Sequence, residues 1–115
     1  MSLSLKCKAG WSPEQIAAAD SKVATLNAAA QRGGLAVSQV ERAGTSAASV
    51  FRSAGGEIPA GMDVDHMIDL QLGGADLFAN MSPLDLSVNR SLGAQIGAQL
   101  RGVPVETCVI GVVIC

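Results

Sequence analysis

The stretch Gly61-Met-Asp-Val-Asp-His-Met-Ile-Asp-Leu-Gln-Leu-Gly-Gly74 decides the fold of this chain. Residues Met62 to Asp65 alternate apolar and acidic side chains, which is the pattern of a short strand. Gly73-Gly74 favours a loop, because glycine adopts backbone geometries that other residues resist. Met81 to Leu84 returns as a second strand, with Pro83 at a sheet edge or strand end. Residues 61–84 therefore predict two strands joined by a glycine-rich loop.

A helix is expected directly after the second strand. Asp85 or Ser87 is placed to cap its start. An apolar stripe then follows at a spacing of four residues: Val88, Leu92, Ile96 and Leu100. Gly93 and Gly97 weaken such a helix by about 1 kcal/mol each relative to alanine. We therefore expect another part of the backbone to approach the helix closely at these glycines.

The rest of the chain is expected to support this segment. Ser12, Pro13 and Gln15 form a strong helix start, with a serine cap and a capping box, and Ile16, Val23, Leu26 and Ala30 would share one face. Thr45-Ser46 is placed to cap a second, short helix. Thr107 to Ile114 is expected to form a buried strand. We predict one domain over residues 1–115: a helical scaffold (1–56), a core (57–102) and a C-terminal strand (103–115).

Composition limits the possible functions. Aromatic residues make up only 3% of the 115 residues, which leaves little for stacking on bases, and the net charge is −2. Six acidic residues and no Lys or Arg lie between Glu57 and Asp85. This acidic run is either a solvated face or a set of charges that needs a divalent cation. A phosphate substrate would be repelled here until a metal ion arrived.

The cysteines Cys7, Cys108 and Cys115 form no CxxC pair, which argues against zinc. Cys108 and Cys115 would lie too far apart on one strand to bond to each other. The odd count favours reduced, buried thiols, although a bridge from Cys7 to the C-terminal strand stays open. The N-terminus lacks the apolar run of a signal peptide, and the longest apolar run is too short to span a bilayer. We expect a soluble protein, or a soluble piece of a longer one, with no membrane partner.

The order of strand, Asp65-His66, glycine-rich loop, Asn80, strand and a helix bearing Asn89 resembles the HNH nuclease family. More closely, residues 57–107 resemble the C-terminal HNH toxin domains of bacterial polymorphic secreted toxins. The resemblance implies an α+β fold with a ββα-metal (HNH, or His-Me finger) core. It implies Asp65 as the first metal ligand, His66 as general base, Asn80 as the residue that orients the histidine, and Asn89 as the second metal ligand. The third signature residue here is Asn rather than His, a variation known in the family.

The chemistry of these side chains agrees with those roles. Carboxylate and carboxamide oxygens are hard ligands that suit Mg²⁺ or Mn²⁺. A neutral imidazole near pH 7 can accept a proton from a water molecule that attacks phosphorus. Arg90 is expected to contact a phosphate. Arg42 and Arg52 are expected at the surface, and Gln95 and Gln99 are either groove contacts or ordinary exposed residues of the helix.

The expected function is that of a metal-dependent endonuclease toxin that cleaves DNA with little sequence preference. The helix would rest against the minor groove, and binding would be weak and strongly salt-dependent because few positive charges are available. The resemblance further implies secretion or delivery into the cytoplasm of a target cell, an antibacterial role, and a cognate immunity protein. Two alternatives remain open: an RNase on the same scaffold, or a catalytically inactive domain that binds a partner.

Overall fold

The two expected strands form an antiparallel hairpin. The computed structural model describes residues 1–40 and 44–115. Strand β2 (Met62–His66) pairs with β3 (Met81–Asp85), so that His66 lies opposite Met81 and Pro83 lies opposite Val64. Proline is tolerated in β3 because this sheet has two strands, and each strand keeps one unpaired edge. The connecting loop contains two short 3-10 turns, at Leu70–Leu72 and Phe78–Asn80.

Helix α3 (Leu86–Leu100) follows β3 without a loop. Asp85 caps it, since its Oδ2 accepts a hydrogen bond from the Val88 amide at 3.0 Å. The entire apolar stripe from Val88 to Leu100 is buried, as predicted. The expectation about the helix glycines was wrong. A Cβ at Gly93 would meet no atom within 4 Å, and one at Gly97 would meet only Oε1 of Gln71, at 3.5 Å.

The helices before the hairpin begin where the capping residues predicted. Helix α1 (Pro13–Gln31) starts with the full capping box of Ser12 and Gln15, and helix α2 (Ala47–Ser53) is capped by Ser46. Val23, Leu26 and Ala30 of α1 are buried, but Ile16 is 38% exposed, so its assignment to the inner face was wrong.

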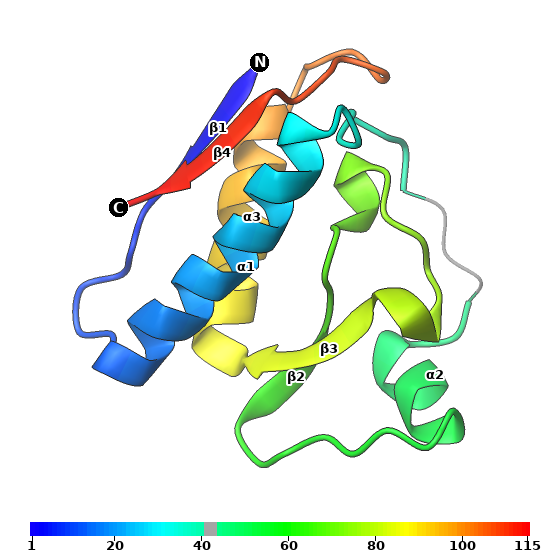
Figure 1. Cartoon of the computed structure of the whole chain (residues 1–115). Coiled ribbons are helices and arrows are strands. Elements are labelled where there is room, and N and C mark those ends of the chain that lie inside the picture. Colours follow the sequence, from blue (N-terminus) through cyan, green and yellow to red (C-terminus); the bar gives the residue numbers. More distant parts are fainter. Residues whose placement is uncertain (41–43) are drawn as a thin grey trace.

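The two ends of the chain form a second sheet that sequence reasoning missed. Strand β1 (Ser2–Leu5) pairs in parallel with β4 (Gly111–Ile114), and the two lie side by side in Figure 1. Residues 1–56 are therefore not an all-helical scaffold. Strand β4 is also shorter than expected and alternates, with Val112 buried and Val113 61% exposed.

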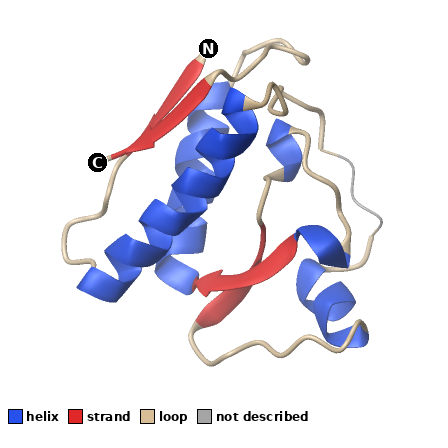
Figure 2. Ribbon diagram, in the orientation of Figure 1, coloured by secondary structure: helices blue, strands red, loops and turns tan. Residues whose placement is uncertain are grey.

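The core lies between the β1–β4 sheet and helices α1 and α3, and the hairpin and α2 lie to one side of it (Figure 2). Strands β1 and β4 and helices α1 and α3 each contribute fully buried side chains: Leu3, Leu5, Leu26, Val88, Leu92, Ile96 and Val112. The protein is thus small, compact and of the α+β class. Among the described residues, no helix is both long and apolar enough to cross a membrane.

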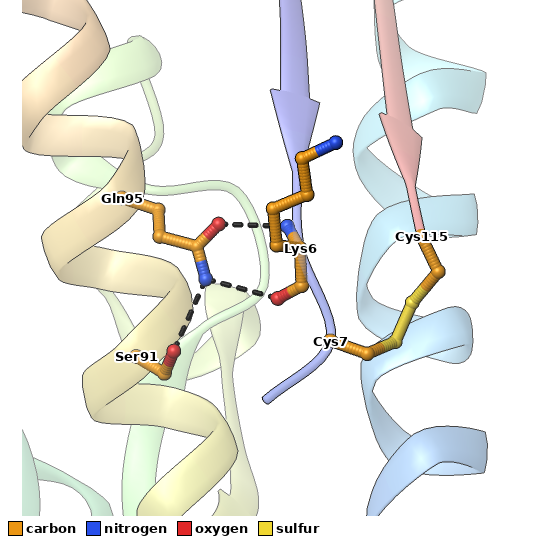
Figure 3. Close-up of a disulfide and its surroundings, with 5 residues drawn as sticks. All are labelled: Lys6, Cys7, Ser91, Gln95 and Cys115. Carbon is orange, nitrogen blue, oxygen red and sulfur yellow. Dashed lines mark hydrogen bonds between the residues drawn. A yellow bond between two sulfur atoms is a disulfide. The ribbon is translucent and has the colours of Figure 1, made fainter. Parts of the chain in front are cut away.

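Two glutamines of α3 hold the outer edge of β1. Gln95 Oε1 accepts from the Lys6 amide at 2.7 Å and its Nε2 donates to the Lys6 carbonyl at 3.0 Å (Figure 3). Gln99 makes the same pair of bonds to Ser4, at 3.1 and 2.8 Å. Neither residue is the groove contact or the free surface residue that we considered. The two amides satisfy backbone groups that an edge strand would otherwise expose.

Cys7 and Cys115 form a disulfide close to the hydrogen bonds between Gln95 and Lys6 (Figure 3). The expectation of reduced, buried thiols was wrong for this pair, and the bridge that had stayed open is present. Cys108 keeps a free thiol, but it is exposed rather than buried. The parallel pairing of β1 and β4 brings the two bridged cysteines to the same end of the sheet, with their Cα atoms 5.4 Å apart.

Candidate functional site

One cavity brings together most of the predicted site residues. It has a volume of about 490 Å³ and is lined by residues of β2, the hairpin loop and α3. Asp65 and His66 at the end of β2 and Asn89 and Arg90 in the first turns of α3 all contribute to its wall. Asn80 does not line it. The hairpin register and the immediate start of α3 after β3 explain why residues more than twenty positions apart meet here.

His66 is held by an aspartate that sequence reasoning did not select. Its Nε2 lies 2.8 Å from Oδ1 of Asp76, and the two side chains are only 12% and 19% exposed. A carboxylate only accepts hydrogen bonds, so Nε2 carries the proton of the neutral ring and Nδ1 keeps the lone pair. The arrangement leaves Nδ1 as the basic nitrogen. The acidic run contained Asp76, but nothing in its spacing pointed to a histidine partner.

The side chain of Asn80 is hydrogen-bonded to the backbone of the hairpin loop and not to the ring of His66, which differs from the role expected for it. Its Oδ1 accepts from the Ile68 amide at 3.0 Å, and its Nδ2 donates to the carbonyls of Ile68 and Ala75 at 2.8 and 2.9 Å. These bonds close the hairpin loop on itself. The loop is so tight that a Cβ at Gly74 would overlap the Ile68 carbonyl oxygen. Asn80 therefore acts on His66 only indirectly, by shaping the loop that carries Asp76.

Asp65 forms an ion pair with Lys22 of α1, which lies 43 positions earlier in the chain. Lys22 Nζ is 2.8 Å from Asp65 Oδ2, and these side chains are 5% and 11% exposed. Burial raises the pKa of Asp65, and the nearby Lys22 charge opposes that rise. Sequence reasoning missed Lys22, because a single lysine in an alanine-rich helix usually points to solvent.

Asn89 and Arg90 both contact Asp63. Asn89 Nδ2 donates to Asp63 Oδ2 at 2.9 Å, and Arg90 Nε lies 3.2 Å from the same oxygen. The hydrogen bond from Asn89 is the main reason that the pKa of Asp63 is lowered, and Arg90 adds to it. The Arg90 side chain is 66% exposed at the cavity wall. Asp63 therefore fixes the two helix residues toward the hairpin.

The acidic run is not a bare solvated face. Five of its aspartates have protein partners: Asp63, Asp65, Asp69, Asp76 and Asp85. The positive partners come from outside the run, from α1 and α3. Arg52 is exposed, as expected, whereas Arg42 lies outside the described residues.

The donors that line the cavity suit a hard cation that keeps most of its water. In the described part of the chain, no three His, Cys, Asp or Glu side chains gather into a metal-binding group. Asp65 and Asn89 nevertheless line the same wall. Lys22 donates a hydrogen bond to Oδ2 of Asp65, and Asn89 uses Nδ2 to donate to Asp63. Asp65 and Asn89 therefore each keep Oδ1 as a potential ligand atom. Two oxygen ligands are enough for Mg²⁺, which usually binds through one or two carboxylates and several waters.

No protein-family model matches this chain, and neither a curated protein nor a solved structure is found to be similar to it.

Proposed function

We propose that this chain is a metal-dependent endonuclease that hydrolyses phosphodiester bonds, with DNA as its substrate. In this proposal β2, β3 and α3 are a ββα-metal core of the HNH type. The observation that carries the proposal is the convergence of His66, Asp65, Asn89 and Arg90 on one cavity.

In this proposal, each residue of the cavity has a separate role in hydrolysis. His66 accepts a proton from the attacking water at Nδ1, while Asp76 holds the opposite nitrogen and stabilises the positive charge that the ring gains. Arg90 is exposed at the cavity wall, so it can bind a phosphate oxygen of the substrate while Asp63 steadies its guanidinium. Asn80 keeps the loop in the shape that presents Asp76.

Asp65 and Asn89 are the residues that would hold Mg²⁺ or Mn²⁺ in this proposal. A bound divalent ion supplies charge stabilisation for the phosphate and for the leaving oxygen. Asp65 presents a carboxylate oxygen and Asn89 a neutral carboxamide oxygen. Both are hard donors, and neither supplies the thiolate or imidazole that zinc sites favour.

The biological setting is part of the same proposal. The resemblance to toxin domains suggests a secreted antibacterial effector that acts in the cytoplasm of a target cell and is blocked by a cognate immunity protein. The Cys7–Cys115 disulfide supports passage through an oxidising compartment, where such bonds form and persist. With a net charge of −2, contact with the DNA backbone would be weak and would fall steeply with salt.

A nuclease assay tests the proposal directly. Plasmid DNA and total RNA are each incubated with the purified protein in Mg²⁺, and then in excess EDTA. We expect DNA cleavage that requires the ion, is abolished by His66→Ala, and is strongly reduced by Asn89→Ala and Arg90→Ala. Arg101→Ala is the matched control, because Arg101 is exposed and does not line the cavity.

Each other outcome of this assay has a clear meaning. Cleavage of RNA alone would replace the proposed substrate with that of an RNase. Full activity of His66→Ala would refute the proposed mechanism. No cleavage of either polymer would favour a domain that only binds a partner.

A further inference from the structure

Lys22 lies inside a cage of oxygen atoms. Its Nζ is 2.8 Å from Asp65 Oδ2 and 2.7 Å from Asp69 Oδ1, and it donates to the carbonyls of His66 and Met67 at 2.6 and 3.0 Å. The lysine side chain is only 5% exposed. The contact with Asp69 is an ion pair without hydrogen-bond geometry, so charge rather than a directed bond holds it.

The composition of this cage is that of a site for a hard cation. Two carboxylates and two backbone carbonyls surround one positive charge. Calcium sites in proteins use the same kinds of oxygen. Carboxylates that are removed from water need a compensating positive charge. Here that charge is the ammonium group of Lys22, a side chain of α1, and not a bound ion.

The cage also shares a residue with the candidate site. Asp65 gives Oδ2 to Lys22 and lines the cavity that contains His66. The two carbonyls in the cage belong to His66 itself and to the next residue. Lys22 therefore holds the backbone at the end of β2, the segment that carries the side chains of Asp65 and His66.

We propose that Lys22 is a built-in cation and a positioning residue for the site. Its ammonium keeps a divalent ion out of the Asp65–Asp69 cage and leaves Asp65 a single oxygen for an ion in the cavity. The second part of this statement rests on the proposed function, whereas the first part does not. Removing the ammonium should convert the cage into a divalent-cation site.

The test compares Lys22→Ala with the parent protein by thermal unfolding and by calorimetric titration, with Ca²⁺ and Mn²⁺ as probes. Alanine suits an alanine-rich helix and leaves space for a hydrated ion. We expect Lys22→Ala to unfold at a lower temperature in EDTA. We expect saturating Ca²⁺ or Mn²⁺ to raise its Tm by about 5 °C more than that of the parent, and to bind about tenfold more tightly. Lys8→Ala, which removes an exposed positive charge, should respond like the parent.

A second variant covers the case in which Lys22→Ala does not fold without an ion. Lys22→Ala combined with Asp69→Asn has the same net charge in the cage as the parent. It should fold, and it should gain a smaller stabilisation from divalent ions, because one carboxylate is missing. Folding of Lys22→Ala only when Ca²⁺ or Mn²⁺ is present would also support the proposal.

The proposal is overturned if neither variant is stabilised by divalent ions more than the parent is. Lys22 would then be only an ion-pair partner that ties α1 to the hairpin. The proposed function fails separately, if the parent binds no Mg²⁺ or Mn²⁺ and cleaves no nucleic acid. Because the readouts are ion binding and stability, the result on Lys22 can be interpreted in either case.

Discussion

Asp76 Oδ1 lies 2.8 Å from Nε2 of His66, and the loop that carries Asp76 is closed by Asn80. This pair fixes the ring of the only histidine in the chain. It also determines which nitrogen is basic, because a carboxylate on Nε2 leaves the lone pair on Nδ1. The ring of His66 is thus held by a residue of the loop rather than by the expected asparagine.

Asp76→Asn should reduce the proposed nuclease activity without abolishing it. The amide can present either an acceptor or a donor to Nε2, so the tautomer is no longer fixed, and the imidazolium loses its counter-charge. We expect a loss of about 10-fold to 100-fold in kcat, against about 100-fold or more for His66→Ala. Activity of Asp76→Asn equal to that of the parent would show that the pair has only a structural role. Circular dichroism of both variants checks that they are folded.

Gly74→Ala and Gly93→Ala should have opposite effects on stability. A Cβ at residue 74 would overlap the Ile68 carbonyl oxygen, so the loop must shift, and we expect a loss of about 2 kcal/mol or more. A Cβ at residue 93 would meet no atom within 4 Å, so the higher helix propensity of alanine should stabilise α3 by up to about 1 kcal/mol. Urea unfolding of both variants measures the difference. Equal effects would contradict the loop geometry described for the Asn80 region.

Gln99→Ala should destabilise the protein by about 1–2 kcal/mol, because it removes two hydrogen bonds from the backbone of Ser4. Gln31→Ala is the matched control. Gln31 is also a helix glutamine, but it makes a single bond of 3.3 Å, to the Ile110 carbonyl. Unfolding free energies from urea titrations should rank the Gln99 variant clearly below the control. The same ranking is expected for Gln95→Ala. If neither variant loses more unfolding free energy than Gln31→Ala, water replaces these glutamine hydrogen bonds without a loss of stability.

Loss of the Cys7–Cys115 disulfide should lower the stability by about 2–5 kcal/mol, since the bridge joins residues 108 positions apart. Cys7→Ser and chemical reduction should give similar shifts in Tm. Cys108→Ser should have no such effect, because that thiol is free and exposed. If reduction leaves the Tm of the parent unchanged, pairing of β1 with β4 is sufficient to hold the two ends together.

Local features of the fold could be predicted from the sequence. Some elements depend only on residues that are neighbours in the chain. These are the starts of α1, α2 and α3, the two hairpin strands and the buried stripe of α3. Capping, the alternation of strand residues and the helical repeat act over a few positions, so a single sequence reveals them. Asp65, His66, Asn89 and Arg90 line one cavity, and their roles there stay a prediction.

Contacts between distant segments could not be predicted in the same way. Strand β1 was missed although Ser2 to Leu5 alternates, because four residues are too few to predict a strand without a known partner. The parallel pairing with β4 places the two bridged cysteines together. Only the packing of α1 against the hairpin shows that Lys22 forms ion pairs with both Asp65 and Asp69.

The sequence by itself determined the three helices, the two hairpin strands and the side chains that can do chemistry, because these properties follow from residue type and from spacing along the chain. The tertiary structure alone decided which side chain pairs with each charged or polar group of the candidate site. Asp76 orients His66, Lys22 holds Asp65, and Asp63 holds Asn89. The physical reason is that ion pairs and hydrogen bonds act over a few ångströms in space, and the distance along the chain does not set that separation.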